Sequence, residues 1–225
     1  LRKSELENRR RYFEYKAQAD ILQRYVAYKL AKKLDLVVTE VKLIDLFIND
    51  NSTGIYLETE RLNESFLRRN KIMPINLYKG EAFMNSEKKV GLEFYLDQNP
   101  GLWEKISIYN AVEKDDYTDL SRFLNDIKGA ESSSVKLNQI LRYDNIELLA
   151  RACVLEILTN GYNGDYIHNR RIALDSWSGN THIIPHDFTY NISEINEESF
   201  TLDKNHTNLF TVLNQSSRFL EVKHN

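Results

Sequence analysis

Apolar residues recur at helical spacing between residues 19 and 36. Leu22, Val26, Leu30 and Leu34 follow one another at intervals of four, with Tyr25 beside them. Side chains at this spacing share one side of a helix, so the pattern predicts an amphipathic helix whose stripe faces the core. An acidic residue near its start and two lysines near its end suit the helix dipole.

A second helical stretch, residues 143–161, carries its own start and stop signals. Asp144 can cap it, with Glu147 three residues later as in a capping box, and Asn160 with Gly161 supplies a stop. Its apolar stripe places Cys153, the single cysteine, on the buried face. We therefore interpret this cysteine as a packing residue rather than a nucleophile.

Alternation with a period of two marks the strands. Residues 41–48 are mostly apolar on both faces, which predicts an inner strand. The polar turn 49–54 and the strand 55–60 complete a hairpin, followed by a short helix at 62–70 and a strand at 75–81. Further along, residues 117–127 read as a helix and residues 128–134 as a loop. Residues 81–118 are not assigned.

The last part of the chain contains a short hairpin and a terminal helix. The stretches "RRIALD" and "HIIPHDF" read as strands around the turn "SWSGN", and residues 209–220 read as a helix. At the other end, residues 1–16 are rich in charge and have no clear apolar stripe.

Composition narrows the class of protein only modestly. The 225 residues carry a formal net charge of −3, which gives no general electrostatic reason to bind nucleic acid. A single cysteine allows no intrachain disulfide, and no apolar run approaches the roughly 20 residues of a membrane span. Because the first residue is leucine rather than methionine, we interpret the chain as a fragment or a mature form, so the lack of a signal peptide is no argument about secretion.

Three polar residues flank the short hairpin in an order that suits phosphoryl transfer. Asp165 and Asn169 precede it and Asp187 follows it, the two aspartates being 187 − 165 = 22 positions apart. In kinases a loop aspartate orients the attacking hydroxyl, while an asparagine and a second aspartate hold the metal ion that bridges the phosphates. Turn chemistry explains the same residues without any activity, so both interpretations stay open at this point.

Other site chemistries find less support. His168 and His186 lie 18 residues apart without a third nitrogen or sulfur ligand close in sequence, which disfavours zinc. The chain has neither a P-loop nor the G-x-S-x-G elbow of a serine hydrolase.

The order of the elements resembles the CotH kinase family, the atypical kinases similar to spore coat protein H. Residues 19–36 resemble the family's N-lobe helix. Residues 41–67 resemble its strand, glycine turn and acidic segment, and "INLYKGE" resembles its L-Y-K element. The stretches "NGDYIHNRRIAL" and "IIPHDF" resemble its Asp–Asn loop and its I-P-W-D element. The likeness extends from about residue 20 to residue 188.

The resemblance implies a role for particular residues of this chain. Asp165 corresponds to the catalytic aspartate, and Asn169 and Asp187 correspond to the metal ligands. Glu58 would lie near the nucleotide base, with Glu60 as the alternative acidic residue, and Lys79 could approach phosphate. A strand-end surface carboxylate and a solvated strand lysine are the alternative readings of Glu58 and Lys79.

Two features depart from the family pattern. The family often has tryptophan before the metal-binding aspartate and a second aspartate two positions after it, where this chain has His186 and Thr189. Without that carboxylate we expect weaker metal binding. The family's earliest strands, which carry its phosphate-contacting lysine, have no counterpart in the sequence pattern of residues 1–16.

The resemblance implies an α+β, protein-kinase-like fold of two lobes. Residues 1–79 would form the remainder of a small N-lobe, with a helix and antiparallel strands, and residues 80–225 a mainly helical C-lobe. The implied activity is transfer of the γ-phosphate of ATP to Ser or Thr hydroxyls of a protein substrate, with Mg²⁺ or Mn²⁺. The alternative is a non-catalytic, kinase-like scaffold in the spore coat, outside the cytoplasm or at the cell surface.

Overall fold

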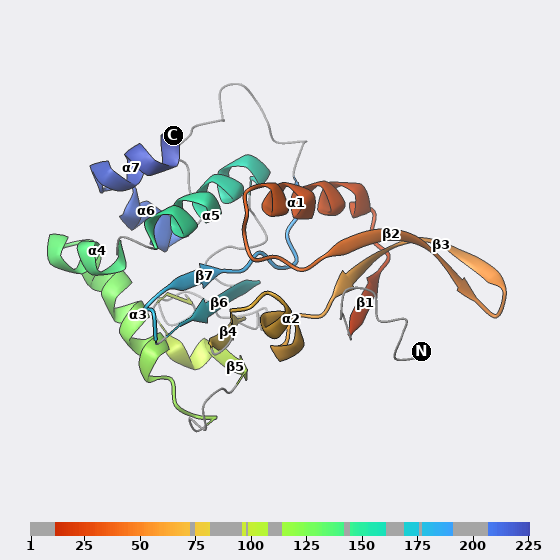
Figure 1. The fold of residues 1–225 in the computed structure, drawn as a ribbon, viewed down its shortest axis with the longest axis horizontal. Helices are drawn as coiled ribbons and strands as arrows, with labels where there is room; N and C mark the ends of the chain where they lie inside the picture. Colours follow the sequence, from red (N-terminus) through yellow and green to blue (C-terminus); the bar gives the residue numbers. More distant parts are fainter. Residues whose placement is uncertain are drawn as a thin grey trace, which may run out of the picture.

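The protein is an α+β structure with two small antiparallel sheets and seven α-helices in the described part of the chain. The structure is a computed structural model and describes residues 12–72, 75–81, 96–97, 99–107, 114–141, 145–160, 169–175, 177–190 and 207–225. One sheet lies near the N-terminus and the other at the centre of the molecule (Figure 1).

The first sheet has the strand order β1-β3-β2. It consists of β1 (Phe13–Lys16), β2 (Val41–Ile48) and β3 (Asn51–Glu60). The predicted hairpin is confirmed, but the prediction that residues 41–48 form an inner strand is wrong, since β3 is the central strand. The outer part of the hairpin extends away from the body of the molecule (Figure 1). Phe47 and Ile55 are therefore exposed. Apolar residues on both faces of β2 thus did not indicate a strand that is covered on both sides.

Helix α1 (Ile21–Lys33) confirms the first predicted helix but packs through an unexpected face. Its buried residues are Arg24, Ala27, Tyr28 and Ala31, whereas Leu22 and Val26 are exposed. The predicted stripe is thus wrong for Leu22 and Val26, while Tyr25, Leu30 and Leu34 are partly buried against the core as predicted. Two alanines and one tyrosine allow close approach to the core, and Arg24 is held there by ion pairs with Asp20 and Asp187.

The central sheet has the strand order β5-β4-β6-β7 and is antiparallel throughout. Its strands are β4 (Asn76–Gly80), β5 (Trp103–Ser107), β6 (Arg170–Leu174) and β7 (Thr181–Ile183). The predicted strand at 75–81 and the predicted hairpin near the C-terminus are both confirmed. Gly80 packs so closely that a Cβ would lie 3.0 Å from side-chain atoms of Leu96 and Trp103.

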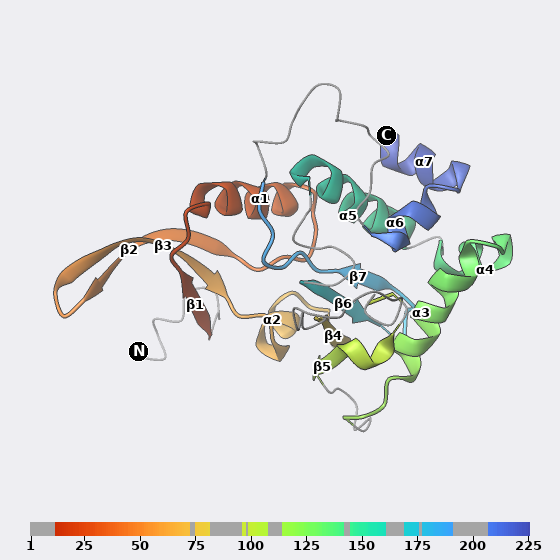
Figure 2. The ribbon, with the colours of Figure 1, turned by 180° about the vertical axis from the view of Figure 1, so that it is seen from behind.

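The remaining helices complete the fold (Figure 2). They are α2 (Glu64–Arg69), η4 (a 3-10 turn, Pro100–Leu102), α3 (Thr118–Ala130), α4 (Ser134–Ile140), α5 (Ile146–Thr159), α6 (Asn208–Leu213) and α7 (Ser217–His224). Helix α5 packs on β7, α4 on α3 and α7 on α5. Helix α3 continues to Ala130, into the predicted loop 128–134, and α4 begins at Ser134 with Ser133 as its cap. Ser216 caps α7 and divides the predicted terminal helix in two.

Helix α5 confirms the best-marked helix of the sequence. Asn160 ends it in the left-handed conformation (φ 50°), and Cys153 is fully buried. Asn145 occupies the N-cap position, and the proposed cap Asp144 lies outside the described residues. None of the described helices is both long enough and apolar enough to cross a lipid bilayer.

A buried ion pair joins the central sheet to the chain that precedes β5. The Arg170 guanidinium donates to Asp97 Oδ1 at 2.5 Å, and both side chains are at most 4% exposed. Removing one member of such a pair leaves an uncompensated charge in the interior. The pair therefore couples β6 to a segment more than 70 positions earlier in the chain.

Replacing this arginine should destabilise the fold strongly. We expect Arg170→Met to lower the free energy of unfolding by about 3–5 kcal/mol, since Asp97 keeps its charge without a partner. Urea denaturation measures the loss. Arg151→Met is the control, because its ion pairs with Asp35 and Glu147 are exposed and a change within about 1 kcal/mol is expected.

The double variant Arg170→Met/Asp97→Leu should recover much of the lost stability, because no charge then remains buried. A fully stable Arg170→Met protein would contradict this assignment.

Candidate functional site

Asp187 is the point at which the first sheet and helix α1 meet the end of the central hairpin. Lys16 Nζ, at the end of β1, lies 2.7 Å from Asp187 Oδ1, and the Arg24 guanidinium lies 2.7 Å from the same oxygen. The Asp187 backbone N–H donates to the Tyr28 hydroxyl at 3.1 Å. The rings of Tyr28 and Phe188 pack with centroids 4.6 Å apart, which anchors the segment after β7 against α1.

The two cations keep Asp187 ionised. Burial by itself raises the pKa of this carboxyl, but the hydrogen bond and charge of Lys16, together with the charge of Arg24, outweigh burial and leave the pKa below its ordinary value. Both cations contact Oδ1. Among the described residues, Oδ2 has no hydrogen-bond or ion-pair partner, so a carboxylate oxygen of a partly exposed side chain stays open to a ligand.

The hairpin brings Asn169 back toward Asp187. Ile172 pairs with Ile183, and the pairing continues beyond β7 because the Ile184 N–H donates to the Arg171 carbonyl at 2.9 Å. In the same register Asn169 falls opposite His186, the residue before Asp187. Asn169 and His186 also line one small cavity.

Asn169 and Asp187 share an uncommon backbone conformation. Their φ angles are 54° and 50°, in the left-handed region that asparagine and aspartate tolerate better than most residues. Asn169 directly precedes β6, and Asp187 follows the end of β7 by four residues. The sequence at these two positions therefore suits the sharp changes of chain direction at the open end of the hairpin.

A cavity of about 590 Å³ lies beside this cluster, between the first sheet and the central sheet. Its lining includes Tyr12 and Glu14 from the β1 region, Lys79 from β4, and Arg171 and His186. Alternate residues of a strand point to the same face, so Lys16 lies on the same face of β1 as Glu14. The size is within the range of ligand pockets.

Lys79 and Glu58 lie in different surroundings. Lys79 is partly buried, pairs in register with Arg171 and lines the cavity. Glu58 pairs with Tyr15, which points to the opposite face of the sheet from Lys16, and its side chain is not among the described residues that line the cavity. The alternative acidic residue, Glu60, is buried and forms an ion pair with Arg69.

The two positions that depart from the family pattern carry neutral side chains. Burial, helped by the charge of Arg171, lowers the pKa of His186 to about 3, so this imidazole is uncharged at neutral pH. His186 Nδ1 and Thr189 Oγ1 are buried and have no hydrogen-bond partner among the described residues. Thr189 supplies no second carboxylate beside Asp187.

The structure does not place the whole predicted set. Asp165 and His168 lie outside the described residues, so the expected convergence of Asp165 with Asn169 and Asp187 stays a prediction. In the described ranges no three His, Cys, Asp or Glu side chains gather as a metal site.

Lys16 and Arg24 were missed by the sequence interpretation. The alternation of aromatic and charged residues in "FEYK" is the signal that could have revealed a strand ending in a lysine. The signal for Arg24 is its spacing from Ala27, Tyr28 and Ala31, which places it on the buried face of α1. Within residues 12–16 the structure forms a strand, β1, which ends in Lys16.

Comparison with known proteins agrees with the resemblance seen in the sequence. No curated protein matches the chain. Residues 17–220 match the family described as CotH kinase protein, which is most of the 225 residues. The chain therefore belongs to the CotH kinase protein family.

Proposed function

We propose that this protein binds ATP with Mg²⁺ or Mn²⁺ and transfers the γ-phosphate to Ser or Thr hydroxyls of a protein substrate. The observation that carries the proposal is the convergence of Lys16 and Arg24 on Asp187, at the edge of a ligand-sized cavity. Phosphoryl transfer requires cations next to an ionised carboxylate. The cations hold the phosphate oxygens, and the carboxylate holds the metal ion.

The donor atoms suit a hard divalent cation. Asp187 offers the carboxylate oxygen Oδ2, and Asn169 carries an amide oxygen at the other side of the hairpin end. Mg²⁺ and Mn²⁺ prefer oxygen ligands of this kind. A metal ion held there would neutralise part of the charge of the phosphates. Asn169 and Asp187 are the proposed ligands.

The remaining residues of the proposed site act on the phosphates and on the acceptor. Lys16 and Arg24 lie close enough to Asp187 to bind phosphate oxygens held next to it. Lys79 and Arg171 line the adjoining cavity, which also carries Arg61 and the carboxylates of Glu14, Glu64 and Glu104. Asp165 is the proposed residue that orients the acceptor hydroxyl and accepts its proton. In this proposal residues 1–79 and 80–225 form two lobes with the nucleotide between them.

One observation favours a second candidate, a kinase-like scaffold without catalysis. Thr189 provides a neutral hydroxyl two positions after Asp187, where the family often has a carboxylate. A site with one charged ligand fewer binds a divalent cation more weakly. In this alternative the protein binds a partner in a spore coat or at a cell surface, and nucleotide serves at most as a structural ligand.

The role of Lys16 is tested by nucleotide affinity. We expect Lys16→Ala to weaken ATP binding by about tenfold or more, because a charge-assisted bond to phosphate is lost. Isothermal calorimetry with Mn²⁺ present measures the affinity. Lys33→Ala is the control, since Lys33 is an exposed lysine on α1. Equal affinity in the Lys16→Ala variant and the wild type would remove Lys16 from the site.

The metal-binding role of Asp187 predicts a loss that depends on the cation. ATP with Mn²⁺ should raise the melting temperature of the wild type through binding to the folded state. In Asp187→Asn this rise should shrink to that seen with ATP and EDTA, because the amide carries no charge. A rise that stays as large in the variant as in the wild type would place the metal elsewhere.

Asp165 separates the enzyme from the scaffold. A positioned acid–base group contributes roughly 10²–10⁴-fold to a rate. We therefore expect Asp165→Ala to keep most of the ATP affinity while losing phosphate transfer by about that factor. Incorporation of labelled phosphate into the protein or a Ser-rich test substrate measures it. If the wild type binds ATP but transfers nothing, the scaffold is the better description.

A further inference from the structure

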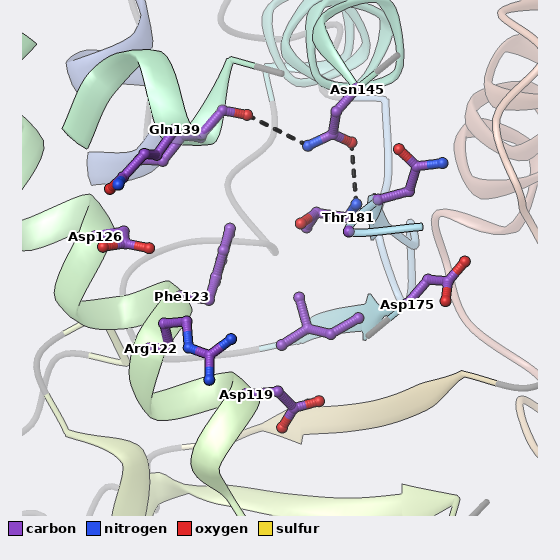
Figure 3. Close-up of a pocket in the computed structure, with 12 residues that line it drawn as sticks. Asp119, Arg122, Phe123, Asp126, Gln139, Asn145, Asp175 and Thr181 are labelled. Atoms are coloured by element: carbon purple, nitrogen blue, oxygen red, sulfur yellow. Dashed lines mark hydrogen bonds between the residues drawn. The ribbon is translucent and has the colours of Figure 1, made fainter. Parts of the chain in front are cut away.

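A second cavity, of about 430 Å³, lies between helix α3 and the turn of the β6–β7 hairpin. In Figure 3, Arg122, Phe123 and Asp126 of α3 face Asn145, at the start of α5, and Thr181, at the start of β7. The cavity shares no lining residue with the one next to Asp187, and none of Lys16, Arg24 and Asp187 contributes to it.

Several polar groups of this cavity have unused bonding capacity. Arg122 and Asp126 have no ion-pair partner among the described residues, although both line the same space. Asn180 Oδ1 is buried without a hydrogen-bond partner. Asn145 is 2% exposed, and its amide nitrogen makes one long contact of 3.5 Å, with the Ile140 carbonyl. A buried oxygen that lacks a donor costs free energy, which a ligand that donates to Asn180 Oδ1 would recover, while Arg122, which is exposed, and Asp126, which is partly buried, are accessible to the same ligand.

The turn between Asp175 and Gly179, which both line the cavity, presents an aromatic ring to solvent. Trp177 is 95% exposed, more than any other large apolar residue of the described chain. Hydrogen bonds stabilise the turn that carries Trp177. The Asp175 side chain accepts one from the Trp177 N–H, at 2.9 Å, and one from the Ser178 hydroxyl, at 2.5 Å. The Gly179 N–H adds a bond to the Asp175 carbonyl at 2.7 Å, and Gly179 has a φ of 78° that favours glycine.

We propose that this cavity and the Trp177 ring together form a binding site for a neutral saccharide. A hydroxyl both donates and accepts, so a row of hydroxyls can serve the acceptor-only carboxylate of Asp126 and the donor-only guanidinium of Arg122 at once. The amides of Asn180 and Gln139 likewise match donor–acceptor pairs, while Asn145, whose amide oxygen accepts from the Thr181 N–H at 3.0 Å, offers its amide nitrogen. The C–H face of a sugar ring can cover the indole, which combines an apolar face with one polar N–H.

Other ligand classes fit the same lining less well. A phosphate or other anion would be repelled by the carboxylates of Asp119, Asp126 and Asp175. A basic peptide would be repelled by Arg122, which has no ion-pair partner among the described residues. A purely apolar ligand would desolvate both Arg122 and Asp126 without giving either a partner. A neutral ligand rich in hydroxyls avoids all three costs.

Tryptophan fluorescence gives a direct readout because the chain has two tryptophans and Trp103 is buried. The probes are glucose, galactose, mannose, N-acetylglucosamine, and the β-1,4-linked tetrasaccharides of glucose and of N-acetylglucosamine. We expect at least one of them to shift the emission to the blue in a saturable way and to protect it from iodide quenching. In Trp177→Phe both effects should disappear.

Two variants locate the binding. Asp126→Ala and Arg122→Ala should each weaken it by about tenfold or more, since each removes a charge-assisted hydrogen bond. Asn125→Ala, at an exposed position of the same helix, is the matched control and should bind as the wild type does. Asp187→Asn should also bind as the wild type does, which keeps this site separate from the proposed nucleotide site.

The proposal is overturned if no saccharide of the panel gives a saturable change, or if Asp126→Ala and Arg122→Ala bind as tightly as Asn125→Ala. A saturable change with an oligolysine peptide and with none of the saccharides would also overturn it, and would assign the cavity to a basic protein segment instead.

Discussion

The shared contact of Lys16 and Arg24 with Asp187 is the interaction on which the arrangement of the site depends. It joins a strand of the first sheet, helix α1 and the segment after β7, three parts of the chain that are far apart in sequence. Because Asp187 is partly buried, its charge has to be compensated, and the two cations do so at a single oxygen. The contact thereby fixes where the first sheet lies relative to the central hairpin.

Charge pairing organises the interior of this protein more widely than its apolar pattern suggests. Arg170 with Asp97 and Arg69 with Glu60 each place a buried or nearly buried carboxylate against a guanidinium, and Arg171 bonds Glu81 beside the larger cavity. Guanidinium groups suit such positions because they stay charged and offer several donors in a fixed plane. The Arg170–Asp97 and Arg171–Glu81 pairs join segments 73 and 90 positions apart, whereas Arg69 and Glu60 are nine positions apart.

The short β6–β7 hairpin serves both proposed sites. Its open end carries Asn169 and Asp187, next to the N-terminal sheet. Its turn carries Asp175, Trp177 and Asn180, next to α3. A strand of five residues separates the two ends.

The sequence by itself determined the family, the α+β class and most of the elements. These predictions came from strong local signals. They include Asn160 at the end of α5, the alternation in β3 and the hairpin that separates Asn169 from Asp187. The roles of Asn169, Asp187, Lys79 and Glu58 came from the resemblance and stay predictions, as does that of Asp165. Periodicity states which residues share a face, but it does not state which face is buried.

Only the tertiary structure decided that Leu22 and Val26 face outward and Arg24 inward, because the partner that makes Arg24 stable in the interior is Asp187, 163 positions away. The same reason applies to Lys16. A cation is placed by the carboxylate that compensates its charge, and the distance between them in space cannot be read from their distance along the chain.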